Sequence, residues 1–254
     1  MTSRYHLHGV QEDCLGKGET IIMKPQVIVA DDHRLVAEGI VKIMEKEYSV
    51  VATAADGRSF IEVVEKIRPD LALVDISLPL LNGLDACRHV KKSCPEVKII
   101  ILTMHSEPHF VNEAFRVGVG GYVLKTSLAD ELLFAAKEVL NGRTYISPVV
   151  AQNLVNQALG SSPGEPSIPL KSAPTVTLSL RQREVLQLVA EGKSNKEIAS
   201  AINVTVKTVE FHKARISKEL GVHTTAELTK QAITLGLIAS PEASPTHNNN
   251  ARSE

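Results

Sequence analysis

Short apolar runs alternate with amphipathic stretches through the first half of the chain. Runs of this kind, bounded by turn residues, are typical of strands that are buried on both faces, as in a parallel sheet. The stretches between the runs carry apolar residues at helical spacing, as Phe60, Val64 and Ile67 do. Strand–helix units joined by short loops predict a doubly wound, flavodoxin-like α/β fold with a five-stranded parallel sheet. The predicted strands are residues 26–30, 50–53, 71–75, 97–103 and 122–125.

The pattern changes near residue 177, where a second and wholly helical part begins. Ser179, Ser194 and Thr205 each precede a helical stretch, and these residue types are typical N-caps. Gly221 follows the third stretch, where a glycine commonly ends a helix. Two short helices that meet at a tight turn around Asn203 predict a small all-α helix-turn-helix domain.

Segments with little periodicity flank and separate these two parts. Residues 146–176 begin with a stretch that could form a helix and continue into a Ser-, Pro- and Gly-rich segment typical of a flexible linker. The first residues are interpreted as a flexible leader, within which Met23 is an alternative start of translation. The last residues, rich in Ser, Pro and Asn, are expected to be disordered. The predicted segments are 1–25, 26–145, 146–176, 177–239 and 240–254.

Composition fits an ordinary globular protein and argues against several classes. Of the 254 residues, 43% are hydrophobic and 22% are charged, which is usual for globular domains. No apolar run is long enough to cross a membrane, and we expect no secretory leader. The cysteines, Cys14, Cys87 and Cys94, form no CxxC pair, which favours reduced thiols and a cytoplasmic location.

Polar side chains stand where four of the predicted strands end. They are Asp31 and Asp32 after the first strand, Asp75 on the third, Thr103 on the fourth and Lys125 on the fifth. Because the carboxyl ends of parallel strands meet at one edge of a sheet, these side chains are expected to converge. Carboxylates brought together repel, and Mg²⁺ suits such a site because it accepts carboxylate and phosphate oxygens.

The same set can handle a phosphoryl group. A carboxylate can accept a phosphoryl group covalently, while a lysine and a hydroxyl hold its other oxygens. Each residue alone has an ordinary interpretation: Asp31 and Asp32 in the first turn of a helix, Thr103 as a cap, and Lys125 as a solvated strand end. Together, on these strands, they predict a phosphoryl-accepting magnesium site centred on Asp75.

The first part of the chain resembles the receiver domain of bacterial two-component response regulators over about residues 26–145. The resemblance implies that Asp75 takes a phosphoryl group from a sensor histidine kinase. It also implies that Thr103 and Lys125 contact that group and that Tyr122 moves with Thr103. The segments that carry it are residues 29–33 (VADDH), 73–79 (LVDISLP), 82–83 (NG), 102–105 (LTMH) and 122–125 (YVLK). The residues that it assigns to Mg²⁺ are Asp31, Asp32, Asp75 and Ser77, the last through its main-chain carbonyl and Asp31 directly or through water.

The two parts differ in charge. Residues 176–240 carry 9 Lys and Arg against 6 Asp and Glu, whereas residues 26–147 carry 14 against 17. The second part, with a net charge of +3, is therefore the better candidate to bind a polyanion. The third helix of this part is expected to turn Val209 and Ile216 inward. Its opposite face, which could also be merely solvated, carries Lys207, Glu210, Phe211, Ala214 and Lys218.

The second part resembles the LuxR-type DNA-binding domain in residues 180–186 (LRQREVL), 192–199 (GKSNKEIA), 208–213 (TVEFHK) and 218–222 (KELGV). With the receiver-like part, the chain is similar to the NarL/FixJ family of response regulators. The resemblance implies that the third helix enters the major groove of promoter DNA. Phosphate contacts are expected from Lys207, Thr208 and Lys218, and base contacts from Glu210, Phe211 and Ala214. The full set of DNA-contact candidates is Asn195, Lys196, Thr205, Lys207, Thr208, Glu210, Phe211, Ala214 and Lys218.

The resemblance further implies a transcription regulator rather than an enzyme, which forms a homodimer when phosphorylated and has no membrane partner. The receiver would pair through a surface near residues 104–122 or through its first and fifth helices, and the DNA-binding domains through Leu228 to Ala232. Three alternatives remain. An aspartate-nucleophile phosphatase normally needs a second acid at position 77, which is Ser77 here. A ligand-sensing LuxR regulator would not need the strand-end set, and a pure protein-interaction module would not bind promoters.

Overall fold

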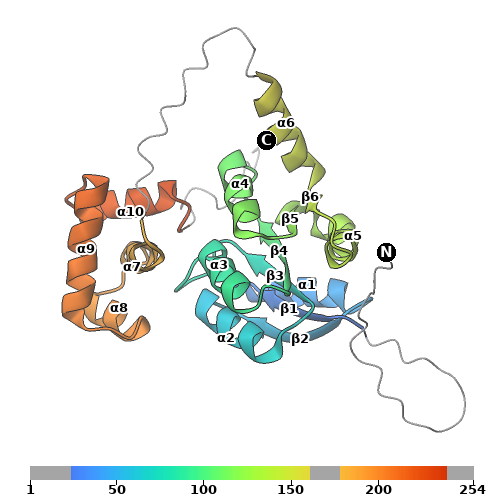
Figure 1. The fold of residues 1–254 in the computed structure, drawn as a ribbon, viewed down its shortest axis with the longest axis horizontal. Coiled ribbons are helices and arrows are strands. Elements are labelled where there is room, and N and C mark those ends of the chain that lie inside the picture. Colours follow the sequence, from blue (N-terminus) through green and yellow to red (C-terminus); the bar gives the residue numbers. More distant parts are fainter. Residues whose placement is uncertain (1–23, 161–177, 239–254) are drawn as a thin grey trace, which may run out of the picture.

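The structure, a computed structural model, describes residues 24–160 and 178–238. The predicted leader up to residue 23, the linker from residue 161 to 177, Cys14, and the predicted tail lie outside the described residues. The described residues form a sheet-containing part and a helical part that lie side by side (Figure 1).

The first part is a parallel sheet with the strand order β2-β1-β3-β4-β5-β6. Its first five strands have the flavodoxin-like order, so the predicted doubly wound α/β fold is confirmed. The predicted strand number is wrong, because a sixth strand pairs with β5. That strand has only two residues, which is too short to give a periodic pattern. The strands are β1 (Gln26–Ala30), β2 (Ser49–Ala54), β3 (Leu71–Asp75), β4 (Lys98–Thr103), β5 (Gly121–Leu124) and β6 (Tyr145–Ile146).

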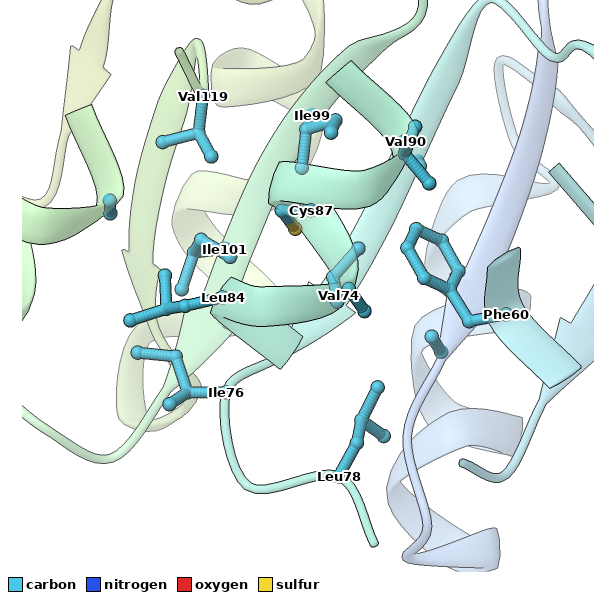
Figure 2. Packing of buried hydrophobic residues seen from close by; sticks show 14 of the residues in the cluster. Phe60, Val74, Ile76, Leu78, Leu84, Cys87, Val90, Ile99, Ile101 and Val119 are labelled. Carbon is cyan, nitrogen blue, oxygen red and sulfur yellow. The ribbon is translucent and has the colours of Figure 1, made fainter. Parts of the chain in front are cut away.

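Helices cover both faces of this sheet. The residues of β1 alternate between the two layers: Ile28 packs with α2, α3 and α4, whereas Val27 and Val29 pack with α1 and α5. Figure 2 shows the first layer, in which Phe60 of α2 and Cys87 of α3 lie among strand residues. The helices are α1 (Arg34–Met44), α2 (Gly57–Ile67), α3 (Gly83–Ser93), α4 (Pro108–Val117) and α5 (Leu128–Leu140).

The chain after α5 is fastened to the sheet by Ser147. Its side chain is buried, donates a hydrogen bond to Glu131 and accepts one from the Leu124 N–H at 3.1 Å. The helix expected in this region is present as α6 (Pro148–Gly160), and Val150 of this helix is buried in the layer of α2, α3 and α4. Strand β6 and helix α6 therefore extend the α/β fold at the β5 edge of the sheet.

The second part contains the helices α7 (Leu180–Ala190), α8 (Asn195–Ala201), α9 (Val206–Leu220) and α10 (Thr225–Thr234). The N-caps expected from the sequence are confirmed. Ser179, Ser194 and Thr205 each accept a hydrogen bond from a backbone N–H in the first turn of their helix. Asn203, between α8 and α9, has a φ of 52°, a left-handed value that asparagine tolerates well. The predicted helix-turn-helix is therefore present.

The core of the helical part explains the pattern of α9. Val209 and Ile216 are buried against α7 and α8, as predicted. Leu228 and Ala232 of α10 are also buried in this core, so the part of this helix that could pair with another DNA-binding domain is its exposed side. The exposed residues of α10 include Ala226, Lys230 and Thr234. No helix among the described residues has both the length and the apolar content to span a bilayer.

Candidate functional site

The ends of the central strands bring the predicted site residues together. Asp75 is the last residue of β3, and Thr103 is the last residue of β4. Asp31 follows β1, and Lys125 follows β5 at the start of a short 3₁₀ turn. Asp31 and Asp75 are each only 3% exposed, and Thr103 is fully buried. The predicted convergence at one edge of the sheet is therefore what the structure shows.

Lys125 joins the two buried carboxylates. Its Nζ lies 2.8 Å from Asp75 Oδ2 and 2.7 Å from Asp31 Oδ2. Burial works to lower the pKa of Lys125, but the attraction of Asp75 and Asp31 outweighs it and raises this pKa. The pKa of Asp75 is raised by burial and by Asp31, and Lys125 offsets part of that rise. The Lys125 ammonium group thus favours the ionised form of Asp75, whereas burial favours the protonated form.

Four residues at this edge could hold a metal ion. The ligand atoms of Asp31, Asp32, His33 and Asp75 all lie within 4.8 Å of one another. The carboxylate oxygens are the hard donors that Mg²⁺ prefers. Asp32 is exposed and faces His33, whose Nδ1 lies 2.8 Å from Asp32 Oδ1. The three carboxylates of this group therefore fit a hard divalent ion. His33 also belongs to the group, although the sequence did not single it out as a metal ligand.

The segment after β3 packs closely around Asp75. The Ser77 N–H donates a hydrogen bond to Asp75 Oδ1 at 3.2 Å, so the Ser77 backbone lies beside this carboxylate. A Cβ atom on Gly83 would lie 1.9 Å from the carbonyl oxygen of Asp75. Only glycine allows the start of α3 to approach the strand end this closely. In the Asn82-Gly83 pair noted in the sequence, the glycine is therefore the residue that lets α3 begin directly against Asp75.

Thr103 and Tyr122 are linked through one backbone segment. Thr103 Oγ1 accepts a hydrogen bond from the His105 N–H at 3.0 Å, and the Tyr122 hydroxyl donates to the His105 carbonyl at 2.9 Å. The Tyr122 ring is fully buried, and burial raises the pKa of its hydroxyl. The two residues predicted to move together therefore hold the same stretch of the loop that leads to α4.

The outward face of α9 is accessible. Lys207, Glu210, Ala214 and Lys218 are exposed, and the Phe211 side chain is 57% exposed. The Phe211 ring lies 5.8 Å from the His212 ring and 5.9 Å from the Arg215 guanidinium of the same helix, and the rest of its surface is open to solvent. Lys196 and Thr205 are exposed as well, whereas Asn195 and Thr208 are partly buried. The Asn195 side chain accepts a hydrogen bond from Lys213 Nζ at 3.1 Å.

A parallel α/β sheet with this strand-edge site, followed by a helix-turn-helix, defines a receiver domain joined to a DNA-binding domain. Residues 27–137 match the family model described as "Response regulator receiver domain". Residues 176–232 match the model "Bacterial regulatory proteins, luxR family". The chain belongs to the NarL/FixJ family of response regulators, which are transcription regulators.

Relatives match along most of their length. The transcriptional regulatory protein DegU of Brevibacillus brevis is 34% identical over 85% of this chain and 95% of its own. The oxygen regulatory protein NreC of Staphylococcus aureus (strain bovine RF122 / ET3-1) is 38% identical over 82% of this chain and 96% of its own.

Solved structures give the same assignment. The RcsB response regulator of Salmonella typhimurium is 26% identical, with a TM-score of 0.56 over 84% of this chain and 99% of its own. The RcsB–DNA complex is also 26% identical, with a TM-score of 0.50 over 83% of this chain and 99% of its own.

Proposed function

We propose that Asp75 is the phosphoryl acceptor through which this response regulator is controlled. The observation that carries the proposal is the buried Asp75 carboxylate at the end of β3, held by Lys125 and facing Asp31. In the reaction, a carboxylate oxygen of Asp75 attacks the phosphorus of a phosphohistidine on a sensor histidine kinase. The new O–P bond forms as the N–P bond breaks, and the imidazole of the kinase leaves. Asp75 must be ionised to attack, and Lys125 favours that form.

Mg²⁺ is the cofactor that the site residues fit. Asp31, Asp32, Asp75 and the Ser77 carbonyl would hold it, with Asp31 binding directly or through water. The ion would supply positive charge to the carboxylates and to the phosphoryl oxygens. His33 is the nearby group that can orient Asp32.

Lys125 and Thr103 are the groups that would hold the transferred phosphoryl group. The Lys125 ammonium is already 2.8 Å from the acceptor carboxylate, so it can bind a phosphoryl oxygen with little movement. The Thr103 hydroxyl would donate to another oxygen. Because Thr103 and Tyr122 both bind the backbone of His105, this donation would also reposition the loop before α4.

The second domain would bind promoter DNA through α9. Lys207, Thr208 and Lys218 would contact phosphates, while Glu210, Phe211 and Ala214 would contact base edges or methyl groups. Thr205, Asn195 and Lys196 would add contacts to the DNA backbone. The exposed face of α9 supports this assignment, as does the existence of an RcsB–DNA complex for a protein of the same family.

The active form would be a homodimer acting on DNA in the cytoplasm, where promoter DNA and the kinase output domain meet. A test is to phosphorylate the purified full chain with acetyl phosphate and Mg²⁺, and to measure its mass in solution together with its selection of DNA sequences. We expect phosphorylation to shift the protein toward dimers and to enrich sites with two half-sites. A monomer that selects the same sequences before and after phosphorylation would refute control through Asp75.

A further inference from the structure

Arg215 lies beside Phe211 on the exposed part of α9. Its side chain is 59% exposed, and its guanidinium carbon lies 5.9 Å from the centroid of the Phe211 ring. The two residues are four positions apart, so they are neighbours on one face of the helix. A guanidinium at this distance is attracted by the face of an aromatic ring. The helix therefore presents a flat cation next to an exposed ring, although the sequence-based set of DNA-contact candidates does not include Arg215.

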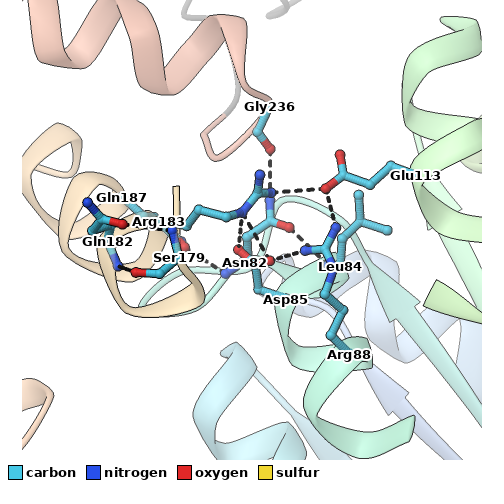
Figure 3. Close-up of polar contacts among 10 residues, drawn as sticks. All are labelled: Asn82, Leu84, Asp85, Arg88, Glu113, Ser179, Gln182, Arg183, Gln187 and Gly236. Carbon is cyan, nitrogen blue, oxygen red and sulfur yellow. Dashed lines mark hydrogen bonds and ion pairs between the residues drawn. The ribbon is translucent and has the colours of Figure 1, made fainter. Parts of the chain in front are cut away.

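Glu219 contacts the Arg215 side chain from the next turn of α9. Arg215 Nη2 lies 3.4 Å from Glu219 Oε1. Glu219 is itself held, because its Oε2 accepts a hydrogen bond from Gln182 Nε2 of α7 at 2.7 Å. Gln182 is 5% exposed, and its side-chain oxygen accepts a hydrogen bond from the Ser179 N–H at 2.8 Å (Figure 3). Two helices therefore contribute to the position of one guanidinium.

This chain of contacts orients Arg215 more than it stabilises the domain. Exposed ion pairs contribute little to stability, because water screens them and ordering two long side chains costs entropy. Among residues 24–160 and 178–238, Glu219 is the only acceptor that Arg215 binds. A guanidinium has five N–H donors, so most of its donors remain available to a ligand. Arg215 is thus a positioned cation with free hydrogen-bonding capacity.

The face of α9 around Arg215 carries opposite charges on its two sides. Lys207, Phe211 and Lys218 recur at spacings of four and seven residues, so they form one line along the helix. At about 100° per residue, Arg215 lies on one side of this line and Glu210 on the other. Both flanking residues are exposed. In a DNA groove the two flanks would therefore meet different bases.

The chemistry of the pair matches two particular base edges. Guanine presents the acceptors O6 and N7 in the major groove, and the planar fork of an arginine binds both at once. Thymine presents a methyl group, which an apolar ring contacts. Because Arg215 and Phe211 are neighbours on the helix, the bases that they contact are neighbours as well.

We propose that Arg215 reads a guanine and that Phe211 contacts the methyl group of a thymine in the adjacent base pair. Each half-site then contains a G·C pair next to a T·A pair. Glu219 is a positioning residue, which acts on the DNA only through Arg215. The inference rests on the proposed function, in which α9 binds promoter DNA.

The surface that carries this pair stays open in the full chain. The receiver contacts α7 through Gln187, which accepts a hydrogen bond from the Asn82 N–H at 2.6 Å. It contacts the segment after α10 through the Gly236 carbonyl, which accepts from the Asn82 side chain at 2.8 Å (Figure 3). Arg215 and Phe211 belong to neither contact and are exposed. The full-length protein is therefore suitable for the tests.

The first test is selection of duplexes from a random DNA library by the full chain, treated with acetyl phosphate and Mg²⁺. Wild type is compared with Arg215→Lys, which keeps the charge but loses the fork, and with Lys218→Ala. We expect wild type to enrich a G·C pair beside a T·A pair. Arg215→Lys should lose the preference for guanine alone, whereas Lys218→Ala should bind more weakly and select the wild-type sequence.

The second test removes single atoms from the DNA. In the selected site, 7-deazaguanine lacks the N7 acceptor and uracil in place of thymine lacks the methyl group. We expect 7-deazaguanine to weaken binding of wild type about tenfold and that of Arg215→Ala less than twofold. Uracil should weaken binding of wild type and leave Phe211→Ala unaffected. Fluorescence anisotropy with each duplex gives these ratios.

A third comparison separates positioning from stability. Glu219→Gln removes the charge that holds Arg215, and Glu38→Gln removes the acid of the exposed Arg34–Glu38 pair, which has the same spacing on α1. We expect the penalty for 7-deazaguanine to fall at least threefold in Glu219→Gln and to stay at the wild-type value in Glu38→Gln. Thermal unfolding should give similar midpoints for both variants. An unchanged penalty in Glu219→Gln would remove its positioning role.

The outcomes distinguish this inference from the proposed function. Wild type that enriches no sequence would overturn both. Wild type that selects a site in which Arg215→Lys and Arg215→Ala keep the same guanine would overturn only the assignment of Arg215. A uniform loss of affinity in Arg215→Ala, with a smaller salt slope and the full 7-deazaguanine penalty, would make Arg215 a phosphate contact and also overturn the assignment.

Discussion

Lys125 Nζ lies 2.8 Å from Asp75 Oδ2, and the same nitrogen lies 2.7 Å from Asp31 Oδ2. The positive charge of this lysine therefore offsets the repulsion between the two buried carboxylates. A divalent ion and a phosphoryl group would each change this balance of charge, one by adding positive charge and the other by adding negative charge. Lys125 is thus the residue whose surroundings change most directly when the site is used.

Replacing Lys125 with alanine should destabilise the protein in chelator by about 1–3 kcal/mol, because two buried carboxylates lose their cation. Added Mg²⁺ should then stabilise the variant more than it stabilises wild type, since the ion replaces the missing charge. Urea unfolding with and without Mg²⁺ measures both effects, with Lys137→Ala on the exposed side of α5 as the control. Equal stabilisation of Lys125→Ala and wild type by Mg²⁺ would contradict a shared site.

Asp75 should make stability depend on pH in a defined direction. Burial raises its pKa above the usual 3.8, so the folded protein keeps this proton to a higher pH than the unfolded chain does. The resulting stabilisation is complete below about pH 3.8 and is lost as the pH rises through the folded pKa. In chelator, Asp75→Asn should therefore be more stable than wild type near neutral pH.

That advantage of Asp75→Asn should shrink as the pH falls toward about 4. Unfolding free energies of the two proteins across this range provide the measurement. Asp70→Asn, immediately before β3 and outside the metal-binding group, controls for the loss of one carboxylate. A variant that is less stable than wild type at neutral pH would show that Lys125 outweighs burial at Asp75.

Lys207 and Lys218 should contribute to DNA affinity without selecting sequence. Either alanine variant should bind all DNA sequences more weakly. Each should also reduce the slope of log affinity against log salt by about 0.9, the value for one lost phosphate contact. Fluorescence anisotropy over a salt series measures this slope, and Lys46→Ala, an exposed position in the receiver, is the matched control. A slope equal to that of wild type would remove the residue from the phosphate-contact set.

Ser147 should matter for the stability of the sheet edge that carries β5. Ser147→Ala leaves the buried Leu124 N–H without its partner, at an expected cost of about 1–3 kcal/mol, whereas the Glu131 oxygen keeps the Tyr145 hydroxyl as a donor. Ser93→Ala, near the exposed end of α3, should cost much less. Thermal or urea unfolding compares the two. A Ser147→Ala protein as stable as the Ser93→Ala protein would show that β6 and α6 are held by other contacts.

The strand-end site could be predicted from sequence because each of its members follows a strongly apolar run. Once the order of parallel strands is assumed, Asp31, Asp75, Thr103 and Lys125 must lie at one edge. The outward face of α9 was predictable for a similar reason, since helical periodicity separates Val209 and Ile216 from the polar positions. In both cases a local pattern fixes the direction of the side chain.

The contacts between the domains could not be predicted in this way. Arg183 and Gln187 lie on α7 at positions that periodicity assigns to solvent, and Gln187 is buried only because the receiver covers it. Leu80 adopts a left-handed backbone conformation, which the sequence does not predict because leucine rarely adopts it. Strand β6 was not predicted because two residues are too few to show the alternation of apolar and polar positions typical of a strand. These features depend on distant parts of the chain, which a local pattern does not report.

The most direct test is to locate the phosphoryl group after reaction with acetyl phosphate and Mg²⁺. Peptide mass spectrometry, after trapping the acyl phosphate by borohydride reduction, identifies the modified residue in wild type and in Asp75→Asn. We predict modification at Asp75 in wild type and none in the variant, while both proteins remain folded. Modification at another residue, or a variant that still accepts the phosphoryl group at the wild-type rate, would contradict the assignment.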